Sequence, residues 1–167
     1  MVLLAVAVLV TFAFALAGIM GAPYVPILKK QSDGVFELAH LQSGQTFIDL
    51  GCGDGRLLRS AASKGIKCIG YEINPFMVLT SRIVCWRYRK LVTVHWANLW
   101  QVTLPRADVI YVFLMPKHMP HLHALLETQI TRPTTVISYA FEIPGRPAKQ
   151  RTTNTFVYDY GSSQPAG

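Results

Sequence analysis

The chain has 167 residues, a length that predicts one domain with its own buried core. It carries 16 basic and 9 acidic side chains, so the net charge at pH 7 is +7, which favours anionic membrane headgroups or nucleic acid as partners. The basic residues are scattered and lack interleaved aromatic residues, which argues against nucleic acid. The three cysteines form no C-x-x-C pair, so no zinc site of the usual spacing can be assembled and no metal is expected.

Residues 1–22 contain no charged side chain and are almost wholly apolar. Spanning a bilayer takes ~20 apolar residues, so the run predicts a transmembrane helix. A signal peptide is the alternative suggested by the small residues 15–17, but no Lys or Arg precedes the run. A buried core helix would usually show a polar stripe. Lys29 and Lys30 follow the run, so the chain is expected to be a single-pass membrane protein with the domain on the cytoplasmic side.

Residues 23–44 are predicted to form a connector and a lid helix. Two prolines stiffen the start of this segment, because each restricts its own backbone and that of its predecessor. Ser32 or Asp33 is expected to cap a short helix that ends at Gly44.

Residues 45–160 alternate short apolar runs with helical patterns, and residues 161–167 are expected to be a disordered tail. The predicted strands are residues 46–50, 67–73, 92–96, 108–114, 134–141 and 155–160. The predicted helices are residues 56–64, 76–89 and 118–130. The alternation predicts an α/β fold: a doubly wound, mostly parallel, Rossmann-like sheet of about six strands, preceded by the transmembrane helix.

The densest basic group of the sequence falls around the end of the second of these helices. Its members are Arg82, Arg87, Arg89 and Lys90. Charge runs of this kind are most often the solvated face of a helix, and this interpretation is favoured over a binding patch.

Three alternating glycines, Gly51, Gly53 and Gly55, follow the first predicted strand. Glycine is needed where φ is positive or where a ligand presses on the main chain. Arg56 occupies the place of the third glycine in a dinucleotide fingerprint, so a pyrophosphate loop fits less well. Glu72 ends the second strand about 20 residues after Gly51, where a carboxylate can accept both hydroxyls of a ribose.

Asp49, Asp54 and Glu72 surround this turn in the predicted fold, because ligands of doubly wound sheets lie beyond the carboxyl ends of the strands. Three acids favour a cofactor that carries an adenosine and a positive centre but no phosphate. Trp96 and Trp100 are interpreted as packing or interface residues rather than cofactor stackers.

Residues 49–55 resemble the first motif of class I S-adenosylmethionine-dependent methyltransferases, and residues 70–75 resemble their acidic second motif. A more specific likeness, to the membrane-anchored protein-lysine methyltransferases of the ATP synthase c-ring protein and the adenine nucleotide translocase, rests on residues 23–26, 107–110 and 138–141. The resemblance covers roughly residues 23–145 and implies S-adenosylmethionine as the cofactor. The chain departs from the class I pattern at its end, where one strand is predicted instead of a two-strand hairpin.

The resemblance implies roles for single residues. Asp49 would face the methionine amino group, Glu72 would hold the ribose, and Asn98 would lie near the adenine, although Asn98 alternatively caps a turn. The expected cofactor-binding residues are Asp49, Gly51, Cys52, Gly53, Asp54, Gly55, Glu72, Ile73 and Asn98. The expected wall of the acceptor site, with Tyr24 in the lid segment, is Tyr24, Leu114, Met115 and Pro116.

Methyl transfer to a lysine amine of a membrane-associated protein is the expected activity, and no general base is identified. The segment 114–116 lacks the Asn/Asp-Pro-Pro-aromatic pattern of enzymes that methylate amino groups of nucleic-acid bases. A membrane-tethered module that binds the cofactor without turnover is an alternative, motivated by the short C-terminus. A nucleotide-dependent oxidoreductase is a further alternative, which Arg56 disfavours. The sequence predicts neither the particular acceptor nor the oligomeric state.

Overall fold

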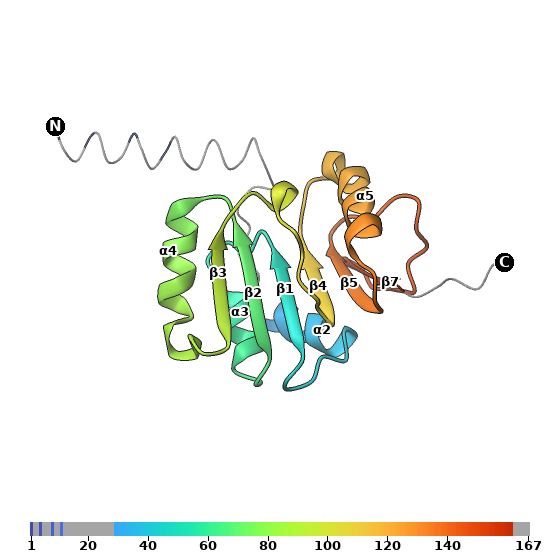
Figure 1. Ribbon diagram of the computed structural model, residues 1–167, viewed down its shortest axis with the longest axis horizontal. Coiled ribbons are helices and arrows are strands. Elements are labelled where there is room, and N and C mark those ends of the chain that lie inside the picture. Colours follow the sequence, from blue (N-terminus) through green and yellow to red (C-terminus); the bar gives the residue numbers. More distant parts are fainter. Residues whose placement is uncertain (2–3, 5–7, 9–10, 12–28, 162–167) are drawn as a thin grey trace.

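Seven strands form one sheet, in the order β3-β2-β1-β4-β5-β7-β6, in the computed structural model (Figure 1). The structure describes residues 29–161 and, before them, residues 1, 4, 8 and 11. The strands are β1 Thr46–Leu50, β2 Lys67–Glu72, β3 Val92–Trp96, β4 Val109–Val112, β5 Thr134–Tyr139, β6 Gln150–Arg151 and β7 Thr155–Tyr160. Strands β1 to β5 pair in parallel, whereas β7 is antiparallel to both β5 and β6.

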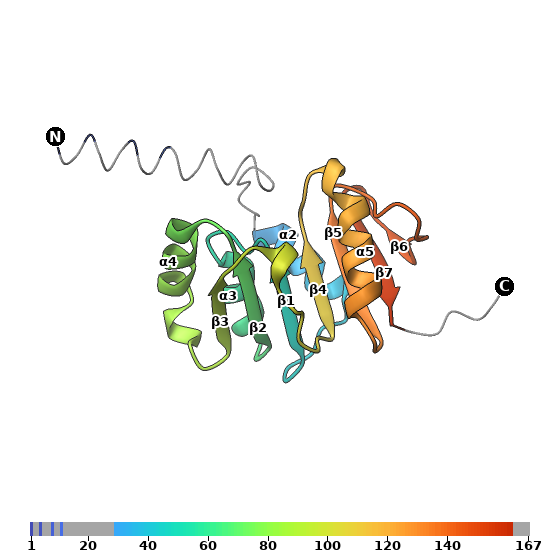
Figure 2. The ribbon, with the colours of Figure 1, turned by 45° about the horizontal axis from the view of Figure 1, so that its top comes forward.

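Helices cover both faces of the sheet. They are α2 Lys29–Leu38, α3 Arg56–Ala62, α4 Pro75–Val84 and α5 Met119–Gln129, with short 3-10 turns η1 Trp86–Tyr88, η2 Leu99–Gln101 and η3 Pro116–His118. Figure 2 shows α5 in front of the strands near β5, with α2 and α3 behind the sheet. Helix α4 lies at the outer end, beside the edge strand β3.

Two cores follow from the alternation of side chains along each strand, which sends successive residues to opposite faces. Phe47 of β1 packs with Leu57 and Leu58 of α3, while its neighbour Ile48 packs on the other face with Leu122 of α5. The central strands are buried on both faces, which is why their sequences read as continuous apolar runs.

The three cysteines, Cys52, Cys68 and Cys85, are free thiols buried on the α3 and α4 side of the sheet. Burial raises the pKa of Cys68 to about 12 and that of Cys85 to about 11, and it raises that of Cys52 well above its ordinary value. These thiols pack as small apolar side chains in the core.

Most of the predicted elements are confirmed. Strands β1, β3 and β7 have the predicted bounds, and the other predicted strands and helices differ from the structure by a few residues at their ends. Helix α2 already includes Ser32 and Asp33, so neither residue caps it as predicted. The connector and the tail, residues 23–28 and 162–167, lie outside the described residues.

The prediction that a single strand follows the fifth is wrong, and so is the count of about six strands. Gln150 and Arg151 pair with Val157 and Phe156, which makes the sheet seven-stranded and mixed rather than purely parallel. A strand of two residues is too short to show a hydrophobic period, so the sequence pattern of this segment gives no sign of it.

The predicted transmembrane helix over residues 1–22 also requires correction. Among the described residues, no helix is both long and apolar enough to cross a membrane. Most of residues 1–22 lie outside the described part of the chain. An apolar run of ~20 residues meets the length condition for a span, but hydropathy alone does not establish that the run forms one helix. The cytoplasmic location of the domain stays a prediction.

Replacing Leu122 by Ala should lower the free energy of unfolding by about 2–5 kcal/mol, because it leaves a cavity under α5. The Leu122 side chain is fully buried. Leu79→Ala, at a position on α4 that is 58% exposed, is the matched control and should cost less than about 0.5 kcal/mol. Urea unfolding measures both, and equal losses would contradict the assignment of Leu122 to the core.

Candidate functional site

A tight turn follows β1, and its main chain is fastened to the end of β2. The backbone amides of Gly51 and Cys52 both donate to the carbonyl oxygen of Tyr71, at 2.9 and 3.0 Å. Gly51, Gly53 and Gly55 have φ angles of 91°, 54° and 77°. Because side chains with a Cβ rarely adopt positive φ, this turn requires its alternating glycines.

Glu72, the last residue of β2, bridges the turn and the start of α4. One carboxylate oxygen accepts the amide hydrogen of Gly53 at 3.0 Å, and the other accepts that of Asn74 at 2.8 Å. The side-chain oxygen of Asn74 in turn accepts from the amide of Phe76 at 3.0 Å and so caps α4. The predicted cap is therefore confirmed, and Glu72 fixes the turn and the helix start together.

Gly55 lies so close to α4 that a side chain has no space. A Cβ built on it would be 2.1 Å from Oγ of Ser81 and 2.9 Å from its Cβ. Ser81 is itself fully buried. The third glycine of the turn is therefore needed for packing of α3 against α4 as well as for its positive φ.

Asp49 is almost completely buried, and burial is the main cause that raises the pKa of its carboxyl to about 8. The negative charges of Glu72 and Asp54 raise it further. Its neighbours in the sheet are Gly70 on β2 and Tyr111 on β4. An acid that is costly to ionise alone is a ready partner for a cation, whose charge would restore the carboxylate.

Asp54 behaves differently from the other two acids of the predicted trio. Its carboxylate pairs with the Arg56 guanidinium at 2.6 Å and accepts the Arg56 backbone amide at 3.2 Å. The residue that replaces the third fingerprint glycine thus balances the charge of Asp54, a pairing that the sequence prediction missed.

The loop after β3 places Asn98 beside Glu72. The amide of Ala97 donates to the Glu72 carbonyl oxygen at 2.9 Å, and the Asn98 side chain caps η2 by accepting from Trp100 at 3.1 Å. The capping alternative for Asn98 is therefore observed, and the adenine role stays a prediction. Trp100 stacks on His121 at 4.3 Å, and the Trp96 indole donates to the carbonyl oxygen of Ile73 at 2.9 Å.

The far side of the same edge is formed by the ends of β4 and β5. Leu114 is 3% exposed and packs in the α5 core, so it supports the expected acceptor wall rather than lining it. Met115 is half-buried and Pro116 is exposed, whereas Tyr24 lies outside the described residues. Half-buried aromatic rings gather here, with Phe113 at 5.4 Å from Tyr139 and 6.5 Å from Phe141.

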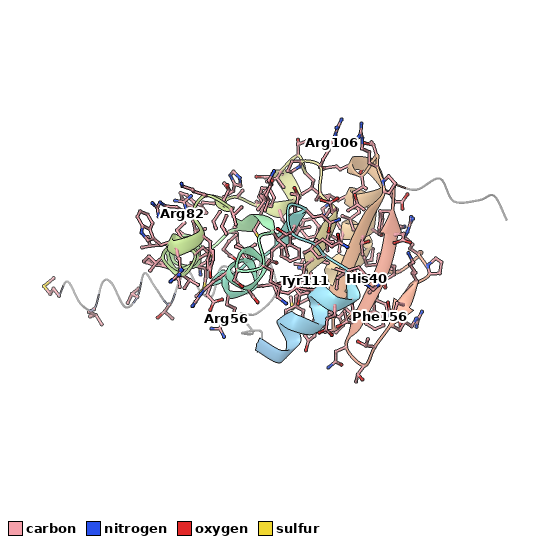
Figure 3. All side chains as sticks on the ribbon, turned by 90° about the horizontal axis from the view of Figure 1, so that it is seen from below. His40, Arg56, Arg82, Arg106, Tyr111 and Phe156 are labelled. Atoms are coloured by element: carbon pink, nitrogen blue, oxygen red, sulfur yellow. The ribbon has the colours of Figure 1, made fainter. Side chains whose placement is uncertain are left out.

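Tyr111 is a further candidate that the sequence prediction missed. Its hydroxyl is buried and has no hydrogen-bond partner among the described residues. It lies on β4 directly across from Asp49 and so points to the same face of the sheet (Figure 3 labels it). Burial raises the pKa of this phenol, and Asp49 and Tyr139 raise it further. The only sequence signal is its register opposite Asp49, because an apolar strand makes a tyrosine look like ordinary core.

Gly55→Ala should destabilise the chain by about 2 kcal/mol or more, since it adds a clash with α4 to the cost of a positive φ. Gly44→Ala is the matched control, because Gly44 has a φ of 87° and a Cβ there would meet nothing within 4 Å. We expect it to cost only about 1 kcal/mol. Urea unfolding compares the two, and a Gly44→Ala variant as unstable as Gly55→Ala would contradict the packing role.

Asp49→Asn should weaken the dependence of stability on pH. The folded-state pKa of about 8 lies above the ordinary value of 3.8, so the folded chain holds this proton more tightly than the unfolded chain. The stabilising contribution is therefore complete below about pH 4 and is lost as the pH rises to about 8. The free energy of unfolding, from urea titrations at several pH values, should fall more steeply over this range in the native chain. Equal slopes would contradict the assignment.

Comparison with known proteins agrees with this geometry. A family model described as the ANTKMT methyltransferase domain matches residues 49–150. The chain is 33% identical to the lysine N-methyltransferase of the ATP synthase c-ring protein from Xenopus laevis over 124 residues, which are 73% of this chain and 54% of that protein. It is 31% identical to a protein-lysine N-methyltransferase of Saccharolobus islandicus, covering 74% of this chain and 79% of that one. The chain thus spans about half the length of the animal relatives.

Among solved structures, an RNA methyltransferase from Salinibacter ruber in complex with S-adenosyl-L-homocysteine superposes with a TM-score of 0.78. It is 26% identical to this chain, and the match covers 86% of this chain and 98% of that one. An O-methyltransferase from Thermotoga maritima, 12% identical with a TM-score of 0.66, shares the fold. The chain belongs to the family of the ANTKMT methyltransferase domain, whose members are class I S-adenosylmethionine-dependent methyltransferases.

Proposed function

We propose that this chain transfers a methyl group from S-adenosylmethionine to a lysine side chain of a protein, and that the acceptor is a membrane protein. The observation that carries the proposal is the arrangement of Glu72 and Asp49 around the glycine turn. Glu72 ends β2 beside the turn, and the buried Asp49 lies on the same face of the neighbouring strand.

The carboxylate of Glu72 has the capacity to hold a ribose as well as the turn. A carboxylate offers about four acceptor sites, and the amides of Gly53 and Asn74 occupy one on each oxygen. The remaining sites can accept the two ribose hydroxyls. Because both oxygens are already positioned by backbone amides, little ordering of the side chain is needed on binding.

Asp49 supplies the charge that a methionine amino group requires. A cation facing this carboxyl lowers its pKa from about 8, so binding would draw the proton from Asp49 at neutral pH. The glycine turn, lacking side chains at three of its positions, leaves the main chain open to close approach. The cofactor, when bound, supplies a methyl group on a sulfonium sulfur.

The acceptor side would lie at the ends of β4 and β5. A lysine amine with an ordinary pKa of about 10.4 must lose its proton before it can attack, and an apolar surrounding disfavours the charged form. Phe113, Tyr139 and Phe141 provide half-buried rings at this place. The chain's contribution there is to exclude water and to align the amine with the methyl group, which lowers the barrier of an in-line transfer.

Lysine is favoured as the acceptor because relatives over 73% to 86% of this chain are named as lysine methyltransferases. Two of these names specify the ATP synthase c-ring protein and the adenine nucleotide translocase, which supports a membrane-protein acceptor. RNA is the alternative raised by the Salinibacter protein. Against RNA stands the segment 114–116, Leu-Met-Pro, which lacks the pattern of base-amino methyltransferases.

Glu72→Gln should weaken S-adenosylmethionine binding by about tenfold or more, since it replaces a charged acceptor by a neutral amide. The matched control is Glu37→Gln, at an exposed acid of α2, which should bind as the native chain does. Isothermal titration calorimetry measures both. Unchanged binding in Glu72→Gln would contradict the proposed ribose site.

The activity itself is tested by incubating the chain and tritiated S-adenosylmethionine with membranes and total RNA from cells that lack the protein. We expect the label in a membrane protein and, by mass spectrometry of that band, on a lysine, with Glu72→Gln giving much less. Label in RNA alone would overturn the lysine assignment. Cofactor binding without label in any fraction would support a binding module without turnover instead.

A further inference from the structure

Helix α4 carries a stripe of exposed apolar side chains on the face turned away from the sheet. Leu79, Ile83 and Trp86 are 58%, 66% and 67% exposed, whereas Val78 and Ser81 of the same helix are buried. The spacing of four and then three residues places the three on one side of the helix and its 3-10 continuation. Large apolar side chains gathered in one exposed patch mark an interaction surface.

Basic side chains border this stripe. Arg82, Arg87, Arg89 and Lys90 are all exposed, and the sequence holds no acidic residue between Glu72 and Asp108. We name these four residues together with Leu79, Ile83 and Trp86 the α4 patch. A purely solvated helix face, the interpretation favoured from sequence, accounts for the charges but leaves the apolar stripe between them unexplained.

Two of the arginines are held in place by the fold. The Arg82 guanidinium donates to the carbonyl oxygen of Val94, on the edge strand β3, at 2.9 Å. That of Arg89 lies 5.1 Å from the centre of the Trp86 ring. Figures 1 and 3 place α4 and Arg82 at the outer end of the molecule, next to β3. The α4 patch is thus a surface with ordered cations around a projecting indole.

We propose that the α4 patch docks on the surface of an anionic phospholipid bilayer, with α4 lying along the interface. Interfacial helices place apolar and tryptophan side chains at the level of the headgroups and keep Lys and Arg at the phosphates. Cations near an anionic surface add to the attraction that the apolar residues supply. The charge and the apolar stripe of the α4 patch match both requirements.

Charge complementarity favours lipid over the other possible occupants. A second copy docking through the same patch would set the same cations against one another. Residues 2–28 of this chain are apolar but contain no acid, so they offer nothing to the arginines. The inference goes beyond methyl transfer and does not rest on it, because the test below uses neither cofactor nor acceptor.

The test uses the full chain with Trp96→Phe and Trp100→Phe, so that Trp86 is the remaining indole. Vesicles of phosphatidylcholine with about one-third phosphatidylglycerol are compared with pure phosphatidylcholine. With the anionic vesicles we expect the Trp86 emission to shift to shorter wavelength and to be quenched by brominated acyl chains. This readout follows α4 itself, so binding through residues 1–22 does not imitate it.

Two variants and a control divide the contributions. Arg87→Gln with Lys90→Gln should weaken partitioning of Trp86 into anionic vesicles about 30-fold, from about a tenfold change per 1.4 kcal/mol and ~1 kcal/mol per charge. Leu79→Gln with Ile83→Gln should weaken it about tenfold or more. The control, Arg106→Gln with Arg132→Gln, removes the same charge at exposed positions off α4 and should have little effect.

Several results would overturn the proposal. One is an unshifted Trp86 in anionic vesicles, and another is an equal shift in vesicles without anionic lipid. A short-wavelength emission before vesicles are added would mean that a segment of the chain covers the stripe. Dimerisation in sedimentation experiments that is lost in Leu79→Gln with Ile83→Gln would assign the patch to a second copy.

Discussion

The site depends on the two amide hydrogen bonds that the Glu72 carboxylate accepts. They join the end of β2 to the turn after β1 and to the first residues of α4, three parts of the chain with no other reason to meet at this angle. Hydrogen bonds to a charged acceptor are stronger than those between neutral groups, so the turn is fixed before any ligand arrives. The same carboxylate adds to the electrostatic cost of ionising Asp49. Order in the turn and a poised acid next to it are therefore two results of one side chain.

The parts of the fold that sequence could predict are those whose pattern is long enough to carry a period. Strands such as β1 and β7 are apolar runs between turn residues, and α4 begins at an Asn-Pro cap. The sequence pattern missed β6, because two residues carry no period and pairing with β7 determines their state. A hydropathy count over residues 1–22 likewise gave the length of an apolar run and not its structure.

The same division holds for the site. Glycine spacing and strand ends brought Glu72 and Asp49 into one prediction, since both follow from backbone geometry. Side-chain partners did not follow, because they depend on packing in three dimensions. Asp54 turned out to be paired with Arg56, and Leu114 turned inward to the α5 core. The buried hydroxyl of Tyr111 became visible only when β4 was placed beside β1.

The buried thiols give the molecule an internal reporter of its own opening. Cys52, Cys68 and Cys85 lie between the sheet and the helices α3 and α4, and their raised pKa values leave almost no thiolate at neutral pH. Alkylating reagents attack the thiolate, so the closed chain should be nearly inert toward them. Any alkylation that does occur measures how often this helix layer separates from the sheet, which makes the breathing of the cofactor side accessible without an added label.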